Sequence, residues 1–143
     1  MSIESLIEDF SFLDDWEERY RYVIELGREL EPLSDDEHSP ANKVQGCVSQ
    51  VWLVTETKTG ATGPLLVFRG DSDAHIVRGL IAILLRIYSG KTAREILDID
   101  ARPILGKLGL NEHLSPQRSN GLYSMVGRIQ TDARAELAAA AQG

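Results

Sequence analysis

The sequence contains a single cysteine, Cys47, among its 143 residues. One cysteine excludes a disulfide within the chain, and it excludes a redox enzyme that pairs a reactive and a resolving cysteine in one chain. Structural zinc sites and iron–sulfur scaffolds normally use several cysteine ligands, so we expect neither. A domain of this length buries roughly 70% of the surface of its unfolded chain, so it needs no such crosslink to hold a core.

Positive charge is also scarce. Lys and Arg total 15 against 22 Asp and Glu, which gives a net charge of −7. Nucleic-acid-binding domains favour a basic surface, so we expect no nucleic-acid partner. A negative charge of this size keeps a protein soluble and suits partners that carry basic patches.

Long apolar runs are absent as well. No run approaches the roughly 18 residues needed to span a bilayer, and the acidic N-terminus lacks the basic start and apolar centre of a signal peptide. The length is that of one ordinary domain, which we assign to residues 1–143. With a lone cysteine, these features predict a cytoplasmic protein with no membrane partner.

Sequence motifs of common enzyme classes are missing. The three histidines, His38, His75 and His113, lie in no recognisable nucleophile motif, although a spatial pair with Cys47 stays open. No GxGxxG or Walker-type motif occurs, so nothing indicates a nucleotide. Cysteine chemistry, if there is any, then concerns one thiol.

The periodicity of apolar residues predicts a small sheet between two groups of helices. Two strands, 51–56 and 65–69, flank a glycine-containing turn and should form an antiparallel hairpin, with a brief extra pairing from 43–45. Helices are expected over 2–10, 16–30, 74–89, 93–97, 103–108 and from Ser119 onward. We therefore expect an α+β domain, in which an antiparallel sheet of two to three strands packs against several helices.

Cys47 follows Gly46 and lies just before the first predicted strand. A lone cysteine is more often a small buried hydrophobe than a reactive group. Glycine frees the backbone and reduces crowding around the sulfur, and reactive groups are often placed in such loops. An accessible thiolate there would be able to attack a sulfur atom of another molecule.

Three other charged residues have simple structural explanations. Asp71 and Asp73 precede a predicted helix, where they are expected to cap its N-terminus. Arg118 lies beside the start of the last predicted helix, where a cation is electrostatically unfavourable. The simplest interpretation is that Arg118 is an ordinary surface arginine. The alternative is that it contacts a molecule outside the chain.

Three segments resemble the SufE family of sulfur-acceptor proteins, in family order and from about Trp16 to Ile129. The first spans 43–52, Lys-Val-Gln-Gly-Cys-Val-Ser-Gln-Val-Trp, and resembles the family's active-cysteine motif. The second is Gly-Asp-Ser-Asp-Ala at 70–74 with Ile-Val-Arg-Gly-Leu-Ile at 76–81. The third is Leu-Gly-Leu at 108–110 with His-Leu-Ser-Pro-Gln-Arg-Ser-Asn-Gly-Leu at 113–122.

This resemblance implies a function that composition does not show. SufE-like proteins partner a pyridoxal phosphate (PLP)-dependent cysteine desulfurase of the SufS or CsdA kind, and the PLP belongs to that partner. Cys47 would take the terminal sulfur of the desulfurase persulfide, which stimulates the desulfurase, and would pass it toward a downstream iron–sulfur scaffold. The fold would be similar to that of the SufE and IscU proteins. The other cysteine ligands of IscU-type scaffolds are missing here, so we expect no cluster assembly on this chain and no cofactor of its own.

The resemblance also assigns roles to single residues. It implies that Cys47 is the persulfide carrier and that Gly46, Arg118 and Asp71 support the site or bind the partner. We expect Cys47 to pack partly against apolar neighbours when free and to swing out on docking. Stand-alone activity is not expected, but two alternatives remain at this stage. One is a thiol enzyme with Cys47 as nucleophile, and the other is an interaction module with a structural cysteine. The sequence leaves monomer or homodimer open, as well as the identity of the desulfurase.

Overall fold

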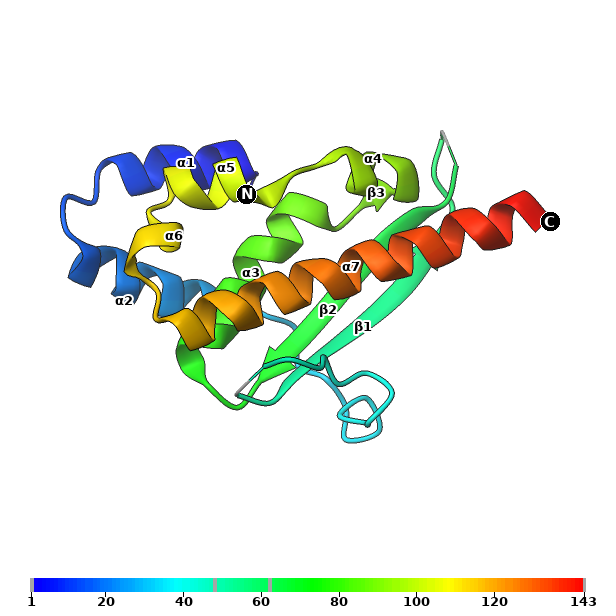
Figure 1. Cartoon of the computed structure of the whole chain (residues 1–143), viewed down its shortest axis with the longest axis horizontal. Coiled ribbons are helices and arrows are strands. Elements are labelled where there is room, and N and C mark those ends of the chain that lie inside the picture. Colours follow the sequence, from blue (N-terminus) through cyan, green and yellow to red (C-terminus); the bar gives the residue numbers. More distant parts are fainter. Residues whose placement is uncertain (1, 48, 62, 143) are drawn as a thin grey trace.

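The computed structural model of the protein describes residues 2–47, 49–61 and 63–142 (Figure 1). Val48, within the first motif, lies outside the described residues. The helices and strands, in chain order, are α1 (Ile3–Ser11), α2 (Trp16–Gly27), β1 (Val51–Lys58), β2 (Leu65–Ser72), α3 (His75–Tyr88), β3 (Lys91–Thr92), α4 (Ala93–Asp98), α5 (Ala101–Lys107), α6 (Leu110–His113) and α7 (Pro116–Gln142).

The sheet has three antiparallel strands in the order β1-β2-β3. β1 and β2 form the predicted hairpin, in which Val51 lies opposite Ser72. β3 contributes two residues to the other edge of β2. The segment before Cys47 pairs with β1 as expected, through an isolated bridge between Lys43 and Trp52. The backbone N–H of Val44 donates to the carbonyl of Val51 at 2.8 Å.

Helices cover one face of this sheet (Figure 1). Alternate residues of β2, from Leu66 to Ser72, are buried on that face, as are Val51 and Leu53 of β1. α3 packs against β2, and α7 runs beside α3 and α4. α3 is apolar almost all round and is deeply buried, as its sequence predicted. The predicted α+β architecture, with a small antiparallel sheet against several helices, is therefore confirmed.

The second face of the sheet is partly covered by the loop that connects α2 to β1. Arg69 and Asp71 of β2 lie on this face, since they alternate with the buried residues. Both are bound by loop residues, Glu37 and His38 respectively. The proline-containing loop is thus held on the sheet, and its last residues lead directly to Cys47.

Helix boundaries near the third motif differ from the prediction. α7 begins at Pro116 and not after Ser119, and the stretch predicted to be irregular contains the short helix α6. The cause is local: Ser115 Oγ accepts a hydrogen bond from the backbone N–H of Arg118 at 3.3 Å. Proline suits the first position of a helix because its missing N–H would have no partner there. Arg118 therefore lies within the first turn of α7.

α2 begins at Trp16 as predicted, capped by Asp15, and ends at Gly27, three residues before the predicted end. α5 begins at Ala101, two residues before the predicted start at Pro103, because Asp100 caps it. Thr92 and Glu95 form the capping box of α4. Among the described residues, no helix has the length and apolar character required to cross a membrane.

Candidate functional site

Cys47 lies in a loop between Lys43 and β1; we call its described residues 45–47, 49 and 50 the Cys47 loop, and Gly46 and Cys47 its tip. The bridge between Lys43 and Trp52 closes its base. Gly46 has a φ of +89°, a conformation that favours glycine. A Cβ atom on Gly46 would lie 2.5 Å from Ser124 Oγ of α7, so only glycine fits here without displacement. The Gly46 conformation brings the Cys47 loop against α7.

Gly121 of α7 lies against the sulfur of Cys47. A Cβ atom on Gly121 would lie 3.6 Å from Cys47 Sγ, in van der Waals contact. The thiol also donates a weak hydrogen bond to the Gly121 carbonyl, with 3.6 Å between sulfur and oxygen. Cys47 is half-buried and packs against the hydrophobic core. This agrees with the expectation that Cys47 packs partly against apolar neighbours in the free protein.

A cavity of about 340 Å³, which we call the Cys47 pocket, opens beside the thiol. It combines an apolar inner side with a polar rim. The buried apolar side chains are Val51, Val77 and Met125, and the polar ones are Ser49, Ser115, Gln117 and Arg118. Arg118 brings a positive charge to the wall. The structure therefore places Arg118 and Cys47 on one pocket, 71 residues apart in sequence.

Burial raises the pKa of the Cys47 thiol above its ordinary value. The closed form of the site therefore favours the thiol, which is a poor nucleophile, over the reactive thiolate. None of the three histidines is among the described residues that line the pocket. His38 binds Asp71, and His113 stacks on Trp16. The spatial cysteine–histidine pair that the sequence left open is therefore not seen in the lining.

Asp73 holds the C-terminal end of the Cys47 loop. Its carboxylate accepts hydrogen bonds from the backbone N–H of Gln50 at 3.1 Å and from the Gln50 side-chain amide at 3.5 Å. The Asp73 backbone N–H donates in turn to the Gln50 carbonyl at 3.3 Å. The prediction that Asp71 and Asp73 cap α3 is wrong, because Ala74 occupies the cap position without a side-chain hydrogen bond. Asp71 lies in β2 and binds His38, whereas Asp73 follows the strand and binds Gln50, so neither carboxylate caps the helix.

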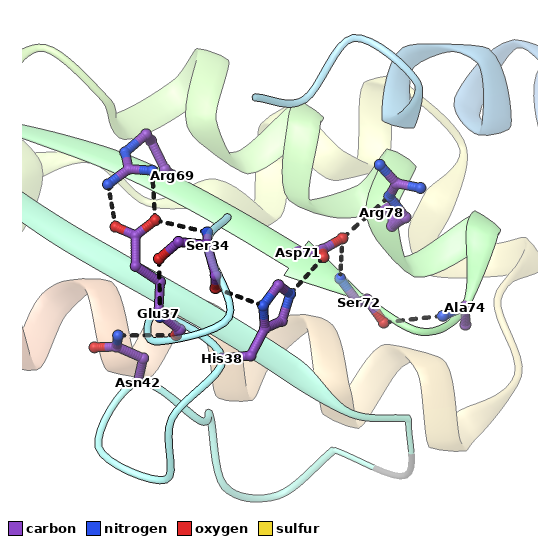
Figure 2. A network of polar contacts seen from close by, with 9 residues as sticks. All are labelled: Ser34, Glu37, His38, Asn42, Arg69, Asp71, Ser72, Ala74 and Arg78. Atoms are coloured by element: carbon purple, nitrogen blue, oxygen red, sulfur yellow. Dashed lines mark hydrogen bonds and ion pairs between the residues drawn. The ribbon is translucent and has the colours of Figure 1, made fainter. Parts of the chain in front are cut away.

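Asp71 belongs to a separate polar network on the second face of the sheet (Figure 2). One carboxylate oxygen accepts from the Ser72 backbone N–H, and Arg78 Nε lies 3.2 Å from the same oxygen. The other oxygen lies 2.8 Å from His38 Nε2. Asp71 is not among the described residues that line the Cys47 pocket. Its geometry indicates that it supports the loop that leads to Cys47, whereas Asp73 contacts the Cys47 loop itself.

His38 is positioned to carry a positive charge. Its Nδ1 lies 2.8 Å from the carbonyl of Ser34, and a carbonyl only accepts. Its Nε2 faces the Asp71 carboxylate, which also accepts. Two acceptors favour the doubly protonated ring, so the hydrogen bond to Asp71 and then that to Ser34 raise the pKa of His38 above its ordinary 6.5. The ring also meets Trp52 edge-on, with centroids 4.7 Å apart.

Neighbouring ion pairs reinforce this loop. Glu37 binds Arg69 through two oxygens, and Arg69 also binds Glu56 of β1. The hydrogen bond from Arg69 is the main cause that lowers the pKa of Glu37 to about 2. The Glu37 contact therefore persists across the pH range in which His38 titrates.

Replacement of His38 by glutamine tests the pH dependence of this contact. The folded state raises the pKa of His38, so its contribution to stability is complete below about pH 6 and is lost as the pH rises through the folded-state pKa. Thermal unfolding midpoints should therefore differ most between wild type and His38→Gln at about pH 5.5 and converge as the pH rises through the folded-state pKa of His38. A gap that stays constant or widens with pH would contradict this assignment.

Several of these contacts had no signal in the sequence. The bonds between Asp73 and Gln50 and between Ser124 and Gly46 join residues 23 and 78 positions apart. Gly121 lay within the third motif, but its contact with the cysteine sulfur is visible only in the fold. The roles predicted for Arg118 and Asp71 toward a partner stay predictions. Among the described residues, no group of three or more metal-ligating side chains gathers in space.

Comparisons with known proteins agree with the predicted family. The model of the family SufE, described as an Fe-S metabolism associated domain, matches residues 4–133. Uncharacterized SufE-like proteins of Rhizobium meliloti and Rhizobium etli are each 59% identical over 138 residues, which cover 96% of this chain and 99% and 93% of theirs. The solution structure of a hypothetical protein from Thermus thermophilus shares the fold, with a TM-score of 0.74 and 19% identity, covering 96% of this chain and 99% of that one. The chain therefore belongs to the SufE family and is a protein associated with Fe–S metabolism.

Proposed function

We propose that this protein is a sulfur acceptor, which takes sulfur from a PLP-dependent cysteine desulfurase onto Cys47. The observation that carries the proposal is the position of the chain's lone thiol, half-buried at a loop tip and open to a pocket that Arg118 lines. The thiol stands in the family's cysteine motif, in a chain associated with Fe–S metabolism. A single half-buried thiol that opens on a pocket suits a group that is received and then passed on.

The transfer follows the chemistry of thiol–disulfide exchange. The Cys47 thiolate attacks the terminal sulfur of the desulfurase persulfide, and a new S–S bond forms on Cys47. The S–S bond of the desulfurase breaks, and its cysteine leaves as a thiolate. One disulfide-type bond replaces another, so no external oxidant or reductant takes part. The Cys47 proton passes to water before the attack, and no general base of this chain takes part in the attack.

The Cys47 pocket suits storage of the product. One added sulfur atom is about the size of a water molecule, whose share of liquid volume is roughly 30 Å³. The cavity of about 340 Å³ holds such a group with space to spare. Its apolar inner side, with Val77 and Met125, would keep aqueous reductants away from the terminal sulfur. Arg118 at the rim would stabilise the negative charge of a persulfide anion.

The closed site requires a partner to open it. Burial disfavours the Cys47 thiolate, so the free protein is guarded against unselective reaction. Docking of the desulfurase would draw the Cys47 loop outward and restore the thiolate. Removal of the persulfide would free the desulfurase for another turnover, which is how an acceptor stimulates it. We assign PLP to the SufS-like or CsdA-like partner, and we place the reaction in the cytoplasm, where a lone thiol stays reduced.

Sulfur loading of Cys47 tests the proposal directly. The protein is incubated with a SufS-type desulfurase and free cysteine, and its intact mass is measured without reductant. Wild type should gain the mass of one sulfur atom, because only its thiolate can accept the transferred sulfur. Cys47→Ser should gain none, and wild type without free cysteine should also gain none. Equal loading of Cys47→Ser, or turnover of a small thiol-reactive substrate with no partner present, would contradict the carrier function.

Replacement of Arg118 by alanine tests its role at the pocket. Arg118 is exposed, and its cap contact uses only the backbone, so Arg118→Ala should leave the fold intact. Loss of an exposed positive charge should slow single-turnover sulfur transfer, or weaken desulfurase binding, by roughly two- to fivefold. Titration of the desulfurase separates the two effects. Arg134→Ala removes an exposed arginine from the same helix and is the matched control. Equal rates and affinities for both variants and wild type would remove Arg118 from the site.

A further inference from the structure

Arg128 of α7 contacts the chain just before the Cys47 loop. Its guanidinium donates hydrogen bonds to the backbone carbonyl of Ala41 at 3.2 Å and to that of Lys43 at 3.5 Å. Lys43 is also the residue that bridges to Trp52 of β1. Arg128 lies seven residues beyond Gly121, about 10 Å farther along the helix axis. It therefore binds the base of the Cys47 loop, about two helical turns along α7 from the glycine that contacts the thiol.

Two further residues fix the Arg128 side chain in place. Its Nε donates to Asp132 Oδ1 at 3.3 Å, one helical turn further on. The other Asp132 oxygen accepts from Thr55 Oγ1 of β1 at 2.6 Å. Arg128 and Asp132 are 28% and 21% exposed, so solvent competes with these bonds only in part. A chain of polar contacts thus joins the sheet, through α7, to the carbonyls that precede Cys47.

The tip of the Cys47 loop is held less firmly than its base. Ser124 Oγ lies 3.5 Å from the Gly46 carbonyl, and Cys47 Sγ lies 3.6 Å from that of Gly121. The 3.5 Å separation at Ser124 is at the long end for a hydrogen bond, like that between Arg128 and Lys43, and the thiol is a weak donor. The base carries the bonds from Arg128 together with a strand-like bond of 2.8 Å between Val44 and Val51. The base therefore fixes the point at which the chain leaves the sheet and enters the tip.

We infer that Arg128 is a positioning residue for Cys47, which holds the loop base on α7 and so keeps the thiol in its pocket. The significance for sulfur transfer rests on the proposed function, but the positioning itself does not. Release of Arg128 would let the tip leave α7 more often. The desulfurase would then meet a loop that is already partly open, and a loaded sulfur would be less protected.

Two possible roles of Arg128, one through its positive charge and one through its hold on the loop, predict opposite changes in the reaction rate of Cys47 when Arg128 is lost. If Arg128 acted through its positive charge, its removal would destabilise the Cys47 thiolate and slow reactions of the sulfur. If it acts by holding the loop, its removal exposes the thiol and speeds those reactions. The sign of the change therefore identifies the mechanism.

Alkylation of Cys47 by iodoacetamide tests the inference without any desulfurase. The thiolate sulfur bonds to carbon, iodide leaves, and the thiol proton goes to water, so Cys47 reports its own exposure. We expect Arg128→Met to react roughly three- to tenfold faster than wild type, the effect of losing one or two partly exposed hydrogen bonds. Arg128→Lys keeps the charge but cannot span both carbonyls, and it should also react faster. Arg134→Met, an exposed site on the same helix, should match wild type.

The pH profile of the same reaction gives a second readout. Burial raises the pKa of Cys47, so opening the loop should lower the pH at which alkylation reaches half its maximum rate. Unchanged or slower alkylation of Arg128→Met, with an unshifted profile, overturns the inference. If Arg128→Met fails to fold by circular dichroism, the same criteria apply to Arg128→Lys. A wild type that takes no sulfur from the desulfurase refutes the proposed function instead, and the alkylation comparison still decides the role of Arg128.

Discussion

The site depends on the close approach between the Cys47 loop and α7. Glycine occupies the contact on both sides: Gly46 meets Ser124, and Gly121 meets the cysteine sulfur. A side chain at Gly46 would collide with α7, and its positive φ would strain any other residue. The approach encloses the pocket, buries half of the thiol and raises its pKa. The pocket, the raised pKa of Cys47 and the lower reactivity of its thiol thus all follow from this one packing contact. The sheet and α3 support the contact.

A sulfur carrier faces two opposing demands. It must expose a thiolate to the donor, yet it must shield the loaded sulfur from solvent reductants. A half-buried cysteine on a loop with a firm base and a weakly bonded tip meets both, because only the tip has to move. Asp73 holds one end of this loop and Arg128 the other. The His38–Asp71 network lies farther back and fixes the approach to the base (Figure 2).

Sequence patterns predicted the local elements and singled out Cys47, and missed the contacts that surround it. The α+β class, the hairpin and the buried α3 followed from periodicity, and the family followed from three motifs that include Cys47 and Arg118. Periodicity carries no information on partners far apart in the chain, so Asp73 was assigned to helix capping although it binds Gln50. Arg128 carried no motif at all. Its proposed role rests on contacts with two backbone carbonyls, and the sequence does not indicate which carbonyls a side chain will meet.

The central claim is that the folded protein protects a sulfur carried on Cys47. The most direct measurement is the rate at which dithiothreitol removes that sulfur from the loaded protein and from an equally loaded peptide of residues 43–52. The reductant thiolate attacks the terminal sulfur and Cys47 leaves as a thiolate, so the chemistry is identical in both. The account predicts removal at least several-fold slower from the protein, with the difference abolished by urea. Equal rates for protein and peptide would show that the pocket does not shield the sulfur.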